Sequence, residues 1–368
     1  MKQKIIWWMV LGALAAVLGY GVQLLAIPGG WFAAAMLVAV VAGLVRPSHP
    51  RITSPVLMGV QAVIGTMLGI NIRPGVIPVL LFHLPAIIGV VAVTIGVSIA
   101  AGVVISRISS ISRETATLGT MPGGAGAMIA ISLGTEADTK IVALMQYLRL
   151  ILVVMSAVLV ASFLVHYTGH TGHTPGASLA IPAQSPVSSH SLIDIFLTFF
   201  MAVLGVWGGR LIRLPTANLL GPMLLGLGVS YFHLFHPVMP VWAPPLAYIL
   251  MGFYVGLLFD RKSLIQARQL LPLLVANTLV LIIVCALTGF AFAGFSGASL
   301  LSGYLATSPG GGDSIAIIAL GSGADLSLVF SVQIIRLLVI VFTGSFMTRA
   351  VLHITRKKGE RQPPIDTD

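Results

Sequence analysis

The stretch TMPGGAGAMI, residues 120–129, interrupts a sequence that is otherwise almost continuously apolar. A closely similar stretch, TSPGGGDSIA, follows at residues 307–316. Proline fixes φ and lacks the N–H that a helix interior needs, and glycine lets the backbone turn tightly. Each stretch therefore predicts a break in a helix, and the relation between the two breaks decides the fold.

The composition identifies an integral membrane protein. Hydrophobic residues make up 57% of the 368 residues and charged residues only 8%, whereas a soluble domain has about 25% charged residues. The apolar segments suit α-helical spans of about 20 residues rather than the ~10-residue strands of a barrel. The first segment, residues 5–28, is too long for a signal-peptide core and lacks a small-x-small cleavage site, so we expect it to remain as a helix.

The net charge and the few candidate metal ligands argue against a nucleic-acid partner, a disulfide and a metal cofactor. The net charge of +10 indicates basic residues held on one side of a bilayer, so we expect no nucleic-acid partner. Cys285 is the only cysteine, which rules out an intrachain disulfide. His166, His170 and His173 have metal-ligand spacing, but they stand near or within a Gly-, Pro- and Ser-rich linker without acidic company. We therefore expect no metal and no other cofactor.

The two breaks belong to an internal repeat with an offset of 187 residues. Residues 119–150 and 306–337 share 13 identities in 32 gapless positions. Each half divides into six apolar pieces. In the first half they are residues 5–28, 31–45, 55–72, 78–106, 115–134 and 138–166, and in the second half 192–209, 217–236, 243–259, 269–295, 301–321 and 325–348.

The distribution of Lys and Arg favours an inverted repeat. If all twelve pieces cross the membrane, 11 basic residues fall inside and 7 outside. If the fifth piece of each half instead enters and returns on the same side, the division becomes 17 against 1, as the positive-inside rule requires. Five crossings per half then invert the second half relative to the first. Both termini are expected to be cytoplasmic, in a bacterial inner membrane.

The sequence therefore predicts an all-α polytopic membrane protein with two inverted five-span repeats, each with a re-entrant Pro-Gly-Gly hairpin. The expected organisation is a first membrane repeat at 1–166, an extracytoplasmic linker at 167–190, a second, inverted repeat at 191–353 and a basic cytoplasmic tail at 354–368. The tail could contact anionic membrane lipids. The GxxxG pairs Gly65/Gly69 and Gly252/Gly256 predict close helix packing.

The hairpin tips are candidate substrate-binding elements. Irregular backbone at membrane depth is tolerated only where it is buried in protein or lines a cavity, and a helix N-terminus that begins there favours an anion. The alternative is a packing kink that binds nothing. The candidate residues at the tips are Thr120, Pro122, Gly123 and Gly124 in the first half, and Thr307, Ser308, Pro309, Gly310 and Gly311 in the second.

Two glutamine–arginine pairs complete the candidate site. Gln146 and Arg149 share a helix face at spacing i, i+3, and Gln333 and Arg336 repeat them. Each arginine follows an aspartate by 11 residues, about 16 Å along a helix and so near the midplane. A guanidinium there needs an interior partner. Direct contact with a carboxylate-like substrate and hydrogen bonds that only hold the hairpin carbonyls are both open.

Asp313 is the one acidic residue that we place at membrane depth, and its counterpart in the first half is Gly126. It could carry a coupling proton or help to hold Na⁺. The alternative is a salt bridge to Arg336 or Arg149. Asp138 and Asp325 open helices and are expected to be N-caps.

The paired motifs, together with LIRLPTANLLGPML at residues 211–224, resemble the duplicated membrane domain of the bacterial AbrB family over nearly the whole chain. This family is distinct from the small swapped-hairpin DNA-binding proteins that share its name. Its members are commonly labelled ammonia monooxygenases or regulators of gene expression. The architecture is similar to that of the cation/proton antiporter and anion transporter group, which implies a mobile core of pieces four to six, a scaffold of the earlier pieces and often a homodimer.

We therefore expect a secondary transporter of a small anionic or polar metabolite, coupled to H⁺ or Na⁺, and no enzyme. Paired catalytic acids and HExxH are missing at membrane depth, and no GxxxxGK[ST] loop is present. The alternative is a membrane regulatory protein that affects gene expression without transport. Ammonia monooxygenase activity would need a metal cluster that the sequence does not offer.

Overall fold

A computed structural model describes residues 2–45, 52–72, 76–123, 125–167, 192–214, 216–235, 237–258, 261, 265 and 268–340. The regular elements in these ranges are all α-helices, which confirms the predicted all-α polytopic class. Six of the described helices are long and apolar enough to cross a membrane. They are α1 (Lys2–Leu24), α3 (Ser54–Asn71), α4 (Val76–Ile108), α7 (Thr139–Tyr167), α8 (Leu192–Leu211) and α12 (Leu271–Ser296).

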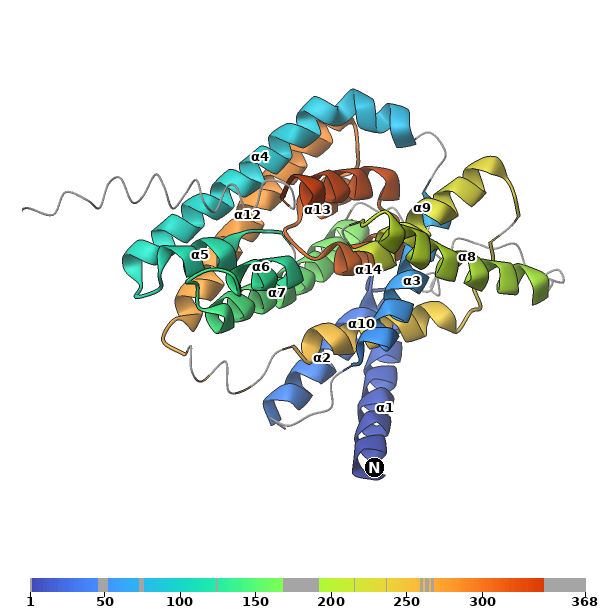
Figure 1. Cartoon of the computed structure of the whole chain (residues 1–368), viewed down its shortest axis with the longest axis horizontal. Coiled ribbons are helices and arrows are strands. Elements are labelled where there is room, and N and C mark those ends of the chain that lie inside the picture. Colours follow the sequence, from blue (N-terminus) through green and yellow to red (C-terminus); the bar gives the residue numbers. More distant parts are fainter. Residues whose placement is uncertain are drawn as a thin grey trace, which may run out of the picture.

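The other described helices are shorter. α2 (Gly30–Val45) and α9 (Ala217–Phe232) have 16 residues each and α10 (Ala243–Gly256) has 14. At 1.5 Å per residue they are about 21–24 Å long, less than the ~30 Å hydrocarbon core of a bilayer. The fifth predicted pieces are each divided into two helices, α5 (Arg113–Thr120) with α6 (Ala125–Ser132), and α13 (Leu300–Thr307) with α14 (Gly312–Ser322). A further helix, unlabelled in Figure 1, covers Leu326–Ile340.

Helix bounds recur at the offset of the sequence repeat. α2 and α9 are 187 residues apart at both ends, and so are α5 and α13. α6 and α14 share their starting position, and so do α7 and the helix Leu326–Ile340. The predicted linker beyond Tyr167 and the basic tail lie outside the described residues.

The helices form two groups in space (Figure 1). The glycine-packed group contains α1, α2 and α3 with α8, α9 and α10, and the broken-helix group contains α4 to α7 with α12, α13, α14 and the helix Leu326–Ile340. Each group takes equivalent helices from both halves of the chain. One apolar core runs through both groups and includes Phe32, Ile64, Val153 and Ile318.

The glycine-packed group is held together by the two GxxxG pairs. A Cβ at Gly65 or Gly69 on α3 would overlap with backbone carbonyl groups of α9. A Cβ at Gly252 or Gly256 on α10 would overlap in the same way with carbonyl groups of α2. These glycines therefore permit close backbone approach, as predicted. The packing is reciprocal, because α3 of the first half contacts α9 of the second while α10 of the second contacts α2 of the first.

The two halves differ in one respect that matters for the site. α14 packs against α3 of the glycine-packed group, and Ile318 on it is fully buried. The equivalent residue on α6, Ile131, is only half-buried. Leu133, just after α6, is 74% exposed, whereas its counterpart Leu320 is half-buried. The second break is thus enclosed between the groups and the first is more open.

Candidate functional site

Both Pro-Gly-Gly stretches interrupt a helix, as predicted. α5 ends at Thr120, Met121 is extended with ψ of 130°, and α6 begins at Ala125. α13 ends at Thr307, Ser308 is extended with ψ of 129°, and α14 begins at Gly312. In each case the proline follows directly on the extended residue, where it cannot continue the helix. Gly124 lies outside the described residues.

Gln146 and Arg149 on α7 supply donors to the end of α5. Gln146 is fully buried, and its Nε2 donates to the carbonyl oxygens of Leu118 at 2.8 Å and Met121 at 3.0 Å. Arg149 Nη1 donates to the carbonyl oxygens of Thr120 at 3.1 Å and Met121 at 2.8 Å. Arg149 Nη2 donates to Gln146 Oε1 at 2.7 Å, so the pair acts as one unit.

Gln333 and Arg336 do the same at the end of α13. Gln333 Nε2 donates to the carbonyl oxygens of Leu305 at 3.0 Å and Ser308 at 3.3 Å. Arg336 donates from Nη1 to the Ser308 carbonyl at 2.7 Å, and from Nη2 to the Gly310 carbonyl and to Gln333 Oε1. Leu305 and Ser308 are the counterparts of Leu118 and Met121, so the two hydrogen-bond patterns correspond at these carbonyls. They differ in the second arginine contact, which is Thr120 for Arg149 and Gly310, the counterpart of Gly123, for Arg336.

These contacts show that the arginines bind the carbonyls at the breaks. The last carbonyls of a helix have no partner within the helix, and leaving one unpaired away from water costs about 1–3 kcal/mol. Both arginines are almost fully buried, at 7% and 4% exposure, and both bind such carbonyls. They therefore hold the breaks in place.

The breaks are reciprocally packed. A Cβ at Gly123 would meet the side chain of Ile340, and a Cβ at Gly310 would meet that of Val153. Val153 and Ile340 are themselves equivalent positions of the repeat, 187 residues apart. The first break thus lies against the helix Leu326–Ile340 and the second against α7, so each packs on the helix that follows the break of the other half.

Two polar atoms at the breaks are buried and without a hydrogen-bond partner, Arg149 Nε and Ser308 Oγ. Ser308 is 1% exposed. The hydroxyl groups of the neighbouring threonines are used differently: Thr120 Oγ1 donates to the Ala116 carbonyl at 3.0 Å, and Thr307 Oγ1 to the Cys285 carbonyl at 2.7 Å. Of the tip side chains, Ser308 is therefore the one whose hydroxyl is left without a partner.

Asp313 does not form the ion pair that was one alternative. Among the described residues it has no basic side chain within ion-pairing distance. It lies half-buried in the first turn of α14, and its Oδ2 accepts a hydrogen bond from Gln61 Nε2 at 2.7 Å. Gln61 is on α3, so this bond joins the glycine-packed group to the broken-helix group. The salt bridge to Arg336 or Arg149 was a wrong alternative.

The contacts of Asp313 continue outward as a polar chain that the sequence analysis missed. Gln61 Oε1 accepts from Asn218 Nδ2 at 3.2 Å, and Asn218 Oδ1 accepts from Arg210 Nη2 at 3.0 Å. The chain runs from exposed Arg210 on α8 to the carboxylate on α14. Its positions in the other half are Gln23, Trp31, Tyr248 and Gly126, which include no acid. The signal that could have found it is a glutamine inside the apolar stretch of α3.

The expected N-caps are present. Asp138 Oδ1 accepts from the backbone N–H groups of Lys140 at 2.9 Å and Ile141 at 3.2 Å, and Asp325 Oδ1 accepts from that of Leu328 at 3.2 Å. The described residues contain no cluster of three His, Cys, Asp or Glu side chains that could hold a metal ion. Two of the three linker histidines, His170 and His173, lie outside them.

Comparison with known proteins shows the family of this chain. The sequence model of the family described as "Transition state regulatory protein AbrB" matches residues 31–352. A protein of Escherichia coli (strain K12) named "Putative regulator AbrB" is 32% identical over 347 residues, which cover 94% of this chain and 96% of that protein. "Uncharacterized protein YhjN" of Bacillus subtilis (strain 168) is 25% identical over 374 residues, covering 96% and 95%. The chain belongs to the AbrB family of helical membrane proteins.

Proposed function

We propose that this protein is a secondary transporter of a small anionic or polar metabolite in the bacterial inner membrane, and not an enzyme. The observation that carries the proposal is the pair of helix breaks. Each break packs on the helix that follows the break of the other half, and each is held by a buried Gln–Arg pair. Transporters of this general design bind substrate where discontinuous helices meet near the bilayer midplane. The proposed site is built from the residues expected from the sequence: some of them contact the substrate and the others hold the breaks that form the site.

The charge at the breaks favours an anion. Arg149 and Arg336 bring two positive charges into the interior, and their described hydrogen-bond partners are neutral carbonyl and amide oxygens. α6 and α14 begin at the breaks, so their N–H groups and helix dipoles add to the positive potential. Because the arginine forks are occupied, we assign direct contacts to the helix N-termini, to Ser308 Oγ and to Arg149 Nε.

The unequal enclosure of the two breaks supports alternating access. Among the described residues α14 packs against α3 of the glycine-packed group, and α6 has no comparable packing against that group. We propose that this is one of two end states, and that in the other α6 takes the enclosed position and α14 the open one. If the hairpins enter from opposite sides, as the Lys and Arg distribution favours, this state is open toward the cytoplasm. Both termini are then cytoplasmic.

Asp313 is our candidate for the coupling ion, H⁺ or Na⁺. It is a carboxylate of the broken-helix group bonded to Gln61 of the other group, so its proton or cation occupancy would affect the contact between them. Asp313→Asn keeps an oxygen to accept the Gln61 hydrogen bond but removes the charge. We expect this variant to bind substrate without the dependence on Na⁺ or pH that the unchanged protein shows.

A regulatory role without transport is the second candidate. It is favoured by the name of the Escherichia coli relative, "Putative regulator AbrB". A regulator of that kind needs no exchange of enclosure between α6 and α14, and no saturable substrate at the breaks. A homodimer is compatible with both candidates.

A ligand screen tests the transporter proposal. The purified full chain is heated in the presence of small carboxylates, amino acids and other metabolites, with and without Na⁺ and across pH. A ligand that binds only the folded state stabilises it by ~2.7 kcal/mol at 100 times its Kd. We expect a saturable shift of the apparent Tm for an anionic or zwitterionic compound.

The variant Ser308→Ala connects that shift to the break. The Ser308 hydroxyl makes no hydrogen bond among the described residues, so its removal should leave the ligand-free protein as stable as before and weaken the ligand shift. Thr66→Val is the matched control, because Thr66 Oγ1 is also buried and unpaired but lies on α3 in the middle of the glycine-packed group. If no compound in the library shifts the apparent Tm, or if both variants lose the ligand shift equally, the regulatory candidate is favoured instead.

A further inference from the structure

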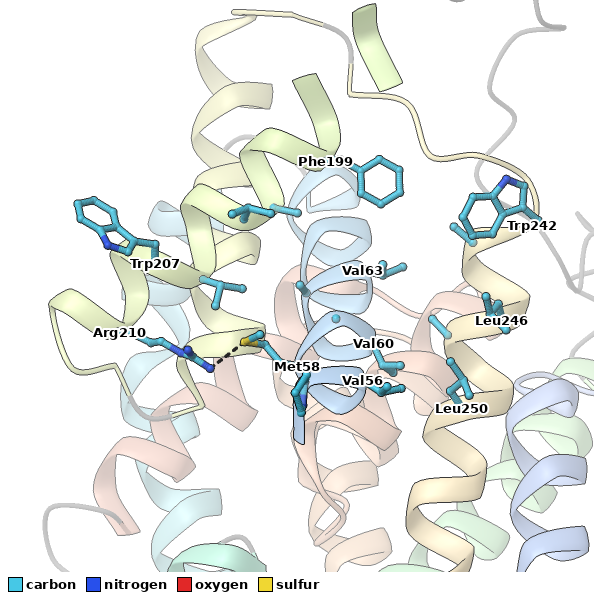
Figure 2. Close-up of a pocket in the computed structure, with 18 residues that line it drawn as sticks. Val56, Met58, Val60, Val63, Phe199, Trp207, Arg210, Trp242, Leu246 and Leu250 are labelled. Carbon is cyan, nitrogen blue, oxygen red and sulfur yellow. Dashed lines mark hydrogen bonds between the residues drawn. The ribbon is translucent and has the colours of Figure 1, made fainter. Parts of the chain in front are cut away.

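An apolar groove lies away from the breaks, on the surface of the glycine-packed group (Figure 2). Its volume is about 560 Å³, within the usual range for small-molecule sites of about 300–1,000 Å³. Figure 2 shows its three walls: α8 with Trp207, α3 with Val60 and α10 with Leu246. These walls are apolar along their length, and several of the side chains are exposed, among them Trp207 at 62%.

One end of the groove carries a positive charge. Arg210, one residue before the end of α8, is the one charged side chain among those that line it. Its Nη2 donates to Met58 Sδ at 2.8 Å and to Asn218 Oδ1 at 3.0 Å, and its Nε to the same Asn218 oxygen at 3.2 Å (Figure 2 shows the Met58 bond). None of the carboxylates in the described residues lies within ion-pairing distance. The guanidinium is therefore oriented by neutral groups, with Nη1 left over.

The charged end has no counterpart in the other half of the chain. Wall positions on α3 and α10 are equivalent, since Val56 and Val63 on α3 correspond to Ala243 and Leu250 on α10, and all four line the groove. The third wall breaks this symmetry. The position of Arg210 in the first half is Gln23, which accepts a hydrogen bond from Trp31 and does not line the groove. The groove is thus apolar throughout, with one cation at one end.

The dimensions suit a single lipid chain. From Phe199 to Arg210 the groove follows α8 for 11 residues, about 16 Å at 1.5 Å per residue. This is close to half of the ~30 Å hydrocarbon core of a bilayer. Trp207 lies one turn before Arg210 and is exposed beside it, as tryptophan often is at the level of lipid headgroups.

We propose that this groove binds one phospholipid, with an acyl chain along α3, α8 and α10 and the phosphate at Arg210. Arginine binds phosphate through parallel N–H···O bonds, and Nη1 is free for this among the described contacts. Because the site offers a cation and no described carboxylate, it selects a headgroup with net negative charge, such as phosphatidylglycerol, over a zwitterionic one with the same chains. The proposal does not depend on the transport function.

Native mass spectrometry of the purified full chain tests this proposal. The protein is titrated with phosphatidylglycerol and phosphatidylcholine of identical acyl chains, and bound lipid and oligomeric state are read from the same spectra. We expect one phosphatidylglycerol per chain, held about tenfold more tightly than phosphatidylcholine, which corresponds to ~1.4 kcal/mol. Arg210→Gln should abolish the tenfold preference. Arg107→Gln, which removes an exposed arginine near the end of α4, should keep it.

A second variant blocks the groove itself. Gly59 lines the groove, and a Cβ there would meet nothing within 4 Å. Gly59→Leu should therefore fold and should weaken the binding of both lipids. Gly89→Leu is its matched control on α4, where a Cβ also meets open space. Equal binding of the two lipids by the unchanged protein, or a preference that survives Arg210→Gln, would overturn the proposal. So would a dimer that dissociates in Gly59→Leu, because the groove would then hold a second copy of the chain.

Discussion

At the scale of single residues, the arginines at the breaks are best understood as replacements for lost helix hydrogen bonds. In water the last carbonyls of α5 and α13 would be solvated, but inside a membrane protein each needs a protein donor or costs several kcal/mol. Arginine carries five N–H donors in a fixed fork, and the glutamine one turn earlier donates to carbonyls of the same break. Because each Arg Nη2 donates to the Gln Oε1, the amide is turned so that Nε2 faces the carbonyls.

This role predicts the effect of removing Arg149. In Arg149→Gln the Thr120 carbonyl and Gln146 Oε1 lose their guanidinium donors, at about 1–3 kcal/mol for each group left unpaired, whereas the Met121 carbonyl keeps its bond from Gln146 Nε2. We expect a stability loss of at least ~2 kcal/mol, seen as a lower apparent Tm and poorer recovery by size-exclusion chromatography. Arg107→Gln, at an exposed position near the end of α4, should change stability by no more than about 0.5 kcal/mol. An unchanged Tm in Arg149→Gln would contradict the structural role.

At the scale of helices, close packing in the glycine-packed group depends on positions that cannot accept a methyl group. The carbonyl oxygen of Leu219 on α9 lies 2.2 Å from where a Cβ of Gly65 would be, and that of Phe32 on α2 lies 2.5 Å from where a Cβ of Gly252 would be. The neighbouring atoms are backbone, so they cannot move aside without separating the helices. Both pairs therefore set the helix–helix distance.

We predict that Gly65→Ala and Gly252→Ala each destabilise the protein by about 1–3 kcal/mol or more, the usual cost of overpacking. Gly228→Ala on α9 is the control, because a Cβ there meets nothing within 4 Å and alanine favours a helix by about 0.5–1 kcal/mol. Thermal unfolding of the three variants under the same conditions makes the comparison. A destabilised Gly228→Ala, or an unaffected Gly65→Ala, would show that the close contact is not what limits these positions.

The sequence predicts much of this level of structure. Proline and glycine locate both breaks, and the repeat anticipates that α2 matches α9 and α5 matches α13. The partners of the polar side chains were harder to predict, because a buried arginine can satisfy its charge in several ways and periodicity does not say which. The chain from Gln61 to Arg210 joins residues up to 157 apart, and a contact of that range has no local signal.

At the scale of the whole molecule, the two halves share a pattern of elements and contacts but not their environment. α14 is enclosed and α6 is not, although residues 119–150 and 306–337 are closely similar. Sequence cannot predict which repeat is enclosed, because two states related by exchange of the repeats would have the same sequence. The hydrogen bond between Gln61 and Asp313 exists in the enclosed half. The equivalent positions, Tyr248 and Gly126, have no contact of this kind among the described residues.

If the proposed exchange occurs, Gly126 should approach Tyr248 in the second state as Asp313 approaches Gln61 in this one. A Cβ at Gly126 now meets nothing within 4 Å, so a cysteine there is tolerated. In a Cys285→Ala background we predict that the pairs Gln61→Cys/Asp313→Cys and Gly126→Cys/Tyr248→Cys both form cross-links in membranes. With all four cysteines present, one cross-link should exclude the other, because the two contacts belong to different states.

A protease site is inserted between residues 167 and 190, and the cut protein is analysed by gel electrophoresis. Both cysteine pairs connect the two halves, so a cross-link keeps the two fragments together and shifts the band. Gly89→Cys with Tyr248→Cys is the control for random collision, because Gly89 lies on α4 and also faces open space. A bound substrate should change the ratio of the two cross-links, since a ligand shifts an equilibrium only by its difference in affinity between the states. A protein that forms only the Gln61–Asp313 pair under every condition has one state, and a transporter with alternating enclosure would then be the wrong description.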